Sequence, residues 1–136
     1  MSRILAIDYG ERRIGLALSD PLGIIAKPLK VIDVKYNSEY LLTIEQLVNE
    51  YSIQKIIVGL PLTLKGEYSK QTNIIIDFIE VLKDRITIPI VKVDERLSSL
   101  AAKKSLIDQG IDFKFNKGEV DKTAAAIILQ EYLDSN

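Results

Sequence analysis

Three short segments rich in apolar residues, at 3–8, 55–60 and 90–94, constrain the fold of this chain more than any other feature. The first is almost continuously apolar, which is typical of a strand buried on both faces of a parallel sheet. Amphipathic segments at about 37–51 and 70–86 separate the three, and their apolar positions recur at helical spacing. Strands joined by such crossovers run parallel, so we expect their carboxyl ends to finish at one edge of a sheet.

Two more strands and two more helices complete the predicted fold. Residues 13–19 and 24–34 are predicted as strands, the second at an edge of the sheet because it contains Pro28. Helices are expected over about 98–110 and 122–133. The resulting order, β-β-β-α-β-α-β-α-α, predicts an α/β fold with a five-stranded mixed sheet flanked by helices.

Helix starts, loops and small side chains give further expectations. Asn37 or Ser38 is expected to cap the first helix, and residues 62–69 and 111–120 to form loops. Small residues alternate along 13–19, at Gly15, Ala17 and Ser19, which lets another layer approach that face closely.

Composition excludes several classes of chemistry. The chain has no Cys, which excludes disulfides, thiolate nucleophiles and iron–sulfur clusters. It has no His, which excludes the usual zinc sites and any Ser-His-Asp triad. A catalytic metal would therefore be held by oxygen ligands, which favours Mg²⁺ or Mn²⁺. The net charge of −1 means that nucleic-acid binding would need a local basic surface.

Length and hydropathy indicate one domain over residues 1–136, of ordinary globular composition. No stretch approaches the ~20 apolar residues needed to span a bilayer. The first residues do not form a signal peptide, because the apolar run reaches Asp8 at once. We therefore expect a cytoplasmic protein.

Acidic residues stand where the expected strands end. Asp8 closes the first strand on the same side as Ile4 and Ala6, and Asp94 and Glu95 close the fifth. Either could have an ordinary structural role: Asp8 as a turn residue bonding its own backbone, the pair at 94–95 as acids at a helix N-terminus. Strand alternation puts Asp94 and Glu95 on opposite faces, so we expect one direct metal ligand, Glu95.

Asp121 is the third candidate. It lies in line with Ala124, Ala125 and Ile128, the stripe expected to face the sheet, so the last helix could deliver its carboxylate to the edge where Asp8 lies. The alternative is that Asp121 is the N-cap of that helix, because Asp is among the best capping residues. Spacing alone leaves both roles open.

Basic residues accompany the acids in or beside the loops at the same edge. They could contact substrate phosphates, or they could be solvated surface charges. The residues concerned are Arg12, Arg13, Lys65, Lys70, Arg96, Lys114 and Lys117.

Four motifs in order give the chain a specific resemblance. They are Asp8-Tyr9-Gly10-Glu11-Arg12-Arg13-Ile14-Gly15-Leu16-Ala17, Val58-Gly59-Leu60-Pro61, Asp94-Glu95-Arg96-Leu97-Ser98-Ser99, and Asp121-Lys122-Thr123-Ala124-Ala125-Ala126 with Leu129-Gln130. Over nearly the whole chain, they resemble the YqgF/RuvX family of pre-16S rRNA processing nucleases, also described as Holliday-junction-resolvase-like. This family belongs to the ribonuclease H-like superfamily.

The resemblance implies a ribonuclease H-like fold and a nuclease. Asp8, Glu95 and Asp121 would be the catalytic acids and would hold Mg²⁺ or Mn²⁺, and Arg12, Arg13, Arg96, Lys65 and Lys117 would contact substrate phosphates. The implied substrate is structured RNA, with the 5′ end of pre-16S rRNA as the cleavage target and the ribosomal particle as a partner. One departure from the wider superfamily concerns the end of the fourth strand, where Gly59-Leu60-Pro61 stands in place of an acid.

The mechanism that follows is phosphodiester hydrolysis by two ions about 4 Å apart, bridged by Asp8 and flanked by Glu95 and Asp121. Three alternatives use the same residues differently. A junction resolvase would act on four-way DNA, and a noncatalytic module would bind nucleic acid or assembling ribosomes. A nucleotide-binding protein is the third, because Asp-x-Gly after a first strand also occurs in actin-like ATPase folds.

Overall fold

The computed structural model of the chain describes residues 3–95 and 117–135, the second range with side chains from residue 124 onward. Its described elements follow the predicted order, with three strands first and helices and strands alternating after them. They are β1 (Arg3–Tyr9), β2 (Arg13–Ser19), β3 (Ala26–Asp33), α1 (Tyr40–Glu50), β4 (Ile53–Leu60), α2 (Lys70–Arg85), β5 (Ile90–Asp94) and α4 (Lys117–Ser135).

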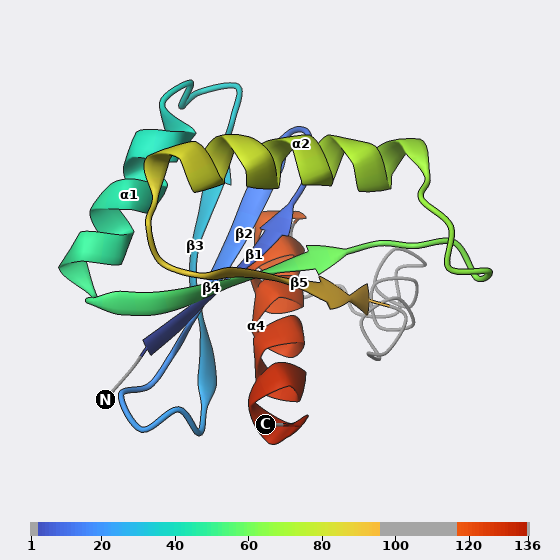
Figure 1. Cartoon of the computed structure of the whole chain (residues 1–136). Helices are drawn as coiled ribbons and strands as arrows, with labels where there is room; N and C mark the ends of the chain where they lie inside the picture. The colour runs from blue at the N-terminus through green and yellow to red at the C-terminus, as the bar shows by residue number, and fades with distance from the viewer. Residues whose placement is uncertain (1–2, 96–116, 136) are drawn as a thin grey trace.

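The sheet has the strand order β3-β2-β1-β4-β5. β1 pairs with β2 antiparallel and with β4 parallel, β3 pairs with β2 antiparallel, and β5 pairs with β4 parallel. The five-stranded mixed sheet is therefore confirmed, with the three parallel strands side by side and β3, which contains Pro28, at an edge. Figure 1 shows α1 and α2 over one face of this sheet and α4 over the other.

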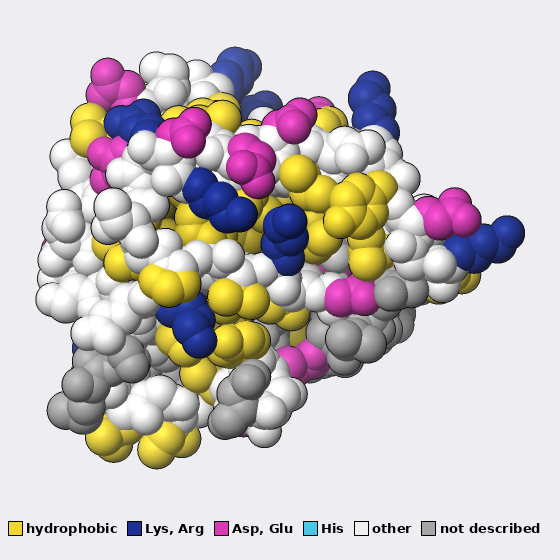
Figure 2. All heavy atoms as spheres, viewed as in Figure 1, with side chains coloured by type: hydrophobic (Ala, Val, Ile, Leu, Met, Phe, Trp, Pro, Cys, Tyr) yellow, Lys and Arg dark blue, Asp and Glu magenta, His cyan; other side chains and the backbone are white. Residues whose placement is uncertain are grey.

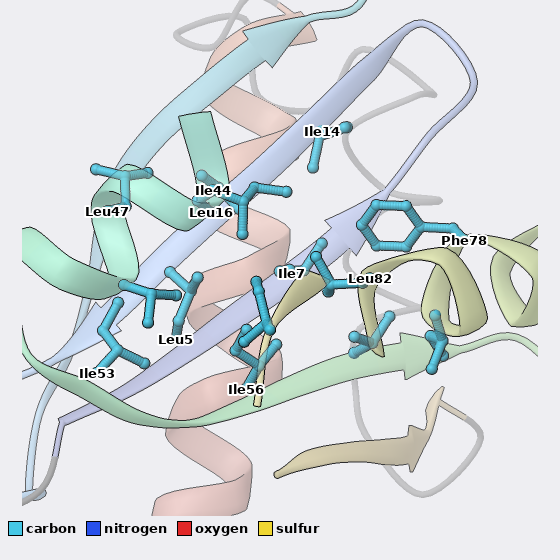
Figure 3. Close-up of a cluster of buried hydrophobic side chains, with 14 of the residues drawn as sticks. Leu5, Ile7, Ile14, Leu16, Ile44, Leu47, Ile53, Ile56, Phe78 and Leu82 are labelled. Atoms are coloured by element: carbon cyan, nitrogen blue, oxygen red, sulfur yellow. The ribbon is translucent and has the colours of Figure 1, made fainter. Parts of the chain in front are cut away.

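Alternate residues of each central strand feed the core under α1 and α2. Leu5 and Ile7 of β1 point to this face and are fully buried. Figure 3 shows them facing Ile44 of α1 and Phe78 and Leu82 of α2. Long aliphatic side chains fill this layer because both helices present an apolar stripe to it.

The opposite face packs closely against α4. On the sheet side, the small residues Ala6 and Ala17 are buried together with Ile57. Ala124 and Ala125 of α4 belong to the same buried cluster. Small side chains on both partners allow the helix backbone to come near the strands, as expected for the small-residue face of residues 13–19. Ser19, also on this face, is buried and accepts a hydrogen bond of 2.8 Å from the Ile4 amide.

Gln130 fixes α4 to the edge of the sheet. Its side-chain carbonyl accepts from the Ala26 amide at 2.9 Å, and its side-chain amide donates to the Ile24 carbonyl at 2.9 Å and to Asp134 Oδ1 at 3.0 Å. One side chain thereby satisfies two backbone groups where β3 begins.

Two expected helix starts are wrong. Glu39 is the N-cap of α1 and makes no side-chain cap bond. The side chain of Asn37, two residues before Glu39, accepts a hydrogen bond from the Glu39 amide. The helix α4 begins at Lys117, five residues before the expected start, so residues 117–120 belong to a helix and not to a loop. The expected helix at 98–110 lies outside the described residues.

No helix in the described part of the chain is long and apolar enough to cross a membrane.

Candidate active site at the carboxyl edge of the sheet

The carboxyl ends of β1, β4 and β5 meet at one edge, as parallel neighbours must. Leu60 and Asp94, the last residues of β4 and β5, are register partners. The edge therefore collects Asp8, the Gly59–Leu60 strand end and the Asp94–Glu95 pair, which are far apart in sequence.

Asp8 lies within β1 and is buried, with 8% of its surface exposed. Its position alternates with Leu5 and Ile7, so it belongs to the α4 face, as Ala6 does. The turn that follows is closed by other groups, the Gly10 amide donating to the Arg13 carbonyl at 2.9 Å. Asp8 therefore lies in the strand, before this turn.

Glycines flank Asp8 in the sheet. Gly15 of β2 is its register partner. On the other side Ile7 pairs with Val58, and continuing this register by one residue sets Gly59 beside Asp8. Neither neighbour has a side chain, so space is left around the carboxylate on the α4 face.

Glu95 occupies part of that space. A Cβ placed on Gly59 would stand 2.6 Å from Glu95 Oε1 and 2.8 Å from Ile128 Cδ1, so the Glu95 carboxylate covers Gly59 next to the α4 helix. Asp94 pairs with Leu60, whose side chain belongs to the core under α1 and α2. Of the two adjacent acids, the structure brings Glu95 to the face that Asp8 occupies.

The backbone of α4 places Asp121 in the second turn of the helix, one turn before the buried Ala125. The N-cap alternative is therefore wrong, because the helix has already begun at Lys117. The side chain of Asp121 lies outside the described residues. Among the side chains that are described, no group of three or more acidic, His or Cys residues could hold a metal ion, so the three-acid site stays a prediction.

Arg12 is engaged by a neighbouring acid. Its Nε and Nη2 donate to Asp33 Oδ1 and Oδ2 at 3.0 and 3.3 Å. The hydrogen bond from Arg12 lowers the pKa of Asp33, against a smaller opposing effect of desolvation. Arg12 is thus fixed beside the end of β3 while about half of its side chain stays exposed.

The other basic residues are placed less completely. Arg13 is half-buried at the start of β2, and Lys65 is exposed on the loop after β4. Arg96 and Lys114, and the side chain of Lys117, lie outside the described residues.

The loop after β4 is held by hydrogen bonds that the sequence did not indicate. Thr72, fully buried in α2, donates its hydroxyl to the Pro61 carbonyl and forms a capping box with Ser69. Thr63 accepts from the Gly66 amide through its carbonyl at 2.8 Å and from the Glu67 amide through its hydroxyl at 3.0 Å. The sequence marked Gly59 through the Gly-Leu-Pro motif at the strand end. No local sequence pattern pointed to the role of Thr72.

Comparison with known proteins identifies a family. The RuvX family model, described as Holliday junction resolvase, matches residues 2–135. Proteins from Roseiflexus sp. and Dictyoglomus thermophilum, each named "Putative pre-16S rRNA nuclease", are 43% and 41% identical to this chain. Each alignment covers 98% of this chain, and 94% and 96% of those proteins, respectively.

Solved structures show the same fold. The Thermus thermophilus RuvC structure in complex with a Holliday junction substrate aligns with a TM-score of 0.62 at 15% identity, covering 99% of this chain and 95% of that one. The fowlpox virus Holliday junction resolvase aligns with a TM-score of 0.55 at 16% identity, covering 98% and 99%.

Proposed function

The chain belongs to the RuvX family, as its four motifs predicted, and from that premise we propose that it is a divalent-metal-dependent endonuclease. The family and its relatives make it a nuclease, an enzyme that hydrolyses phosphodiester bonds. The names of its relatives favour pre-16S rRNA as the substrate. The family resemblance would make the 5′ end of this RNA the target, cleaved during ribosome biogenesis with the ribosomal particle as a partner.

The observation that carries the proposal is the placement of Asp8 and Glu95. They come from β1 and from the residue after β5, and both lie on the α4 face at the carboxyl edge, with Gly59 between their strands. Carboxylate oxygens that meet on one face at a sheet edge are the ligands that a hard divalent cation prefers.

Asp8, Glu95 and Asp121 would hold the ion, and a chain without His or Cys suits Mg²⁺ or Mn²⁺. Such an ion, when bound, supplies a water of lowered pKa and stabilises charge on the phosphate. Asp8 is kept in place by strand pairing on both sides, whereas the Glu95 carboxylate lies against Gly59. In this proposal the two residues would act as a pair of oxygen donors from neighbouring parts of the sheet edge.

Cleavage assays with matched acid variants test the proposal. The substrates are RNA carrying the 5′ region of pre-16S rRNA and a four-way DNA junction, each with Mg²⁺ and with EDTA. Asp8→Asn and Glu95→Gln should each reduce the cleavage rate by ~100-fold or more. Asp94→Asn is the control, because it removes the neighbouring carboxylate on the other face, and it should cleave at close to the wild-type rate.

Equal cleavage by wild type and Asp8→Asn would show that another site, or another protein, is responsible. A junction resolvase is the second candidate, since the family description names that activity. Cleavage of the junction with the RNA left intact would favour it. Binding that survives EDTA without cleavage of either substrate would favour a noncatalytic module.

A further inference from the structure

A tyrosine with two cations over its ring stands exposed in the loop that joins β3 to α1. Tyr36 has 77% of its surface exposed. The guanidinium carbon of Arg12 lies 5.9 Å from the centroid of its ring, and the Lys35 ammonium lies 5.6 Å from it. This combination of a largely exposed aromatic ring with two cations over it suits a ligand that offers a planar group next to an anion.

The tyrosine is presented on an ordered turn. The Asp33 carboxylate accepts from the Arg12 side chain and, at 3.0 Å, from the Lys35 amide. The Asp33 carbonyl accepts from the amides of Tyr36 and Asn37 at 3.1 and 2.9 Å. Because Asp33 holds the Arg12 guanidinium and the backbone amides of Lys35 and Tyr36, little ordering of this turn remains to be done on binding.

The turn lies at the same edge of the sheet as the candidate active site. Asp8 pairs with Gly15, Gly15 pairs with Val31, and Asp33 follows two residues later along β3. Strand geometry then separates the Asp8 and Asp33 backbones by roughly 12 Å. In Figure 2 a Lys or Arg side chain stands at the upper edge of the molecule, where Figure 1 places the loop between β3 and α1.

We infer that Tyr36 is a stacking platform for an unpaired base of the nucleic-acid substrate, with Arg12 and Lys35 beside the flanking phosphates. This inference rests on the proposed function for the identity of the ligand. Every base has a π-face, so the contact is tolerant of sequence, but it needs a base that is not already stacked in a duplex. The substrate class is therefore single-stranded or locally unpaired nucleic acid near the bond that is cleaved.

Binding measurements in the Asp8→Asn protein test the inference without cleavage. Fluorescence anisotropy with a labelled single-stranded RNA, at fixed salt, should show Tyr36→Ala binding on the order of tenfold or more weaker than the parent. Tyr36→Phe keeps the ring and should bind about as tightly as the parent. A fully paired duplex of the same sequence should bind equally to all three proteins, and Lys35→Ala should lower the salt slope of single-strand binding by about one.

Three results would overturn the inference. The first is equal single-strand affinity for Tyr36→Ala and the parent. The second is a loss of single-strand affinity in Tyr36→Phe as large as that in Tyr36→Ala. The third is a loss of duplex affinity in Tyr36→Ala as large as its loss of single-strand affinity. Thermal unfolding of each variant checks that the fold is kept. The readout is binding, so an inactive wild-type enzyme would refute the nuclease proposal alone, and an active enzyme indifferent to Tyr36 would refute this inference alone.

Discussion

The carboxylate of Glu95 occupies the volume that a side chain on Gly59 would need. Glu95 Oε1 lies 2.6 Å from the position of a Cβ on that glycine, closer than real Cβ contacts allow. The end of β4 thus provides the surface on which the acid that follows β5 rests. The absence of an acid at the end of β4 and the position of Glu95 are two aspects of one arrangement.

A Gly59→Ala substitution should therefore displace Glu95. We expect a loss of cleavage comparable to that of Glu95→Gln, with destabilisation of about 1–3 kcal/mol from overpacking against Glu95 and Ile128. Cleavage rates per folded molecule, with urea unfolding to give the folded fraction, measure both effects.

The matched control is Ile128→Ala, which disturbs the same contact from the helix side. It should cost ~2–5 kcal/mol as a cavity in a buried site, yet keep its activity per folded molecule because Glu95 is left in place. Full activity in Gly59→Ala would mean that the site tolerates movement of the Glu95 carboxylate.

The ion pair between Arg12 and Asp33 predicts a pH dependence. Since the hydrogen bond from Arg12 lowers the pKa of Asp33 in the folded state, its contribution to stability is present above the ordinary Asp pKa and is lost as the pH falls through the lowered value. Carboxyl NMR titration should show the Asp33 pKa rising toward its ordinary value in Arg12→Ala, and rising less in Arg13→Ala. An unchanged Asp33 pKa in Arg12→Ala would contradict the ion pair.

Tyr9 predicts a second, alkaline dependence. Its ring stacks on Phe78 with centroids 4.1 Å apart, and burial, assisted by Tyr40 and Glu11, raises its pKa to about 12. The neutral phenol is thus favoured in the folded state, so this contribution to stability is complete below pH about 10 and is lost as the pH rises toward 12.

Ultraviolet titration of tyrosinate can test this. The chain has six tyrosines, and the last of them to ionise should disappear from the titration curve in Tyr9→Phe, which retains the stack on Phe78. A curve for Tyr9→Phe that still contains the late step would assign it to another tyrosine.

The sequence predicted the parts of this fold that depend on local periodicity. Strand alternation separated Asp94 from Glu95 onto opposite faces, and helix and strand patterns gave the parallel order that brings Asp8 and Glu95 to one edge. The helix start at Lys117 was missed because Gly118 disfavours helix, although a glycine costs less in the first turn than in the interior. The contact of the Glu95 carboxylate with Gly59 could not be predicted, because it joins residues from two different strand ends.

The last prediction concerns Gln130, whose partners are 104 and 106 residues away in sequence. Gln130→Ala would leave the amide of Ala26 and the carbonyl of Ile24 without their partner where α4 meets the edge strand. We expect the free energy of unfolding to fall by about 1–3 kcal/mol, measured by urea denaturation.

Asp134→Asn is the control for Gln130→Ala. It alters an exposed partner of the same side chain without touching either backbone group, and it should change stability by less than about 0.5 kcal/mol. Because α4 carries Asp121, a loosened α4 should also weaken Mn²⁺ binding in Gln130→Ala, measured by calorimetry at a temperature where the variant is folded. Unchanged stability in Gln130→Ala would show that packing of Ala124, Ala125 and Ile128 alone holds α4 on the sheet.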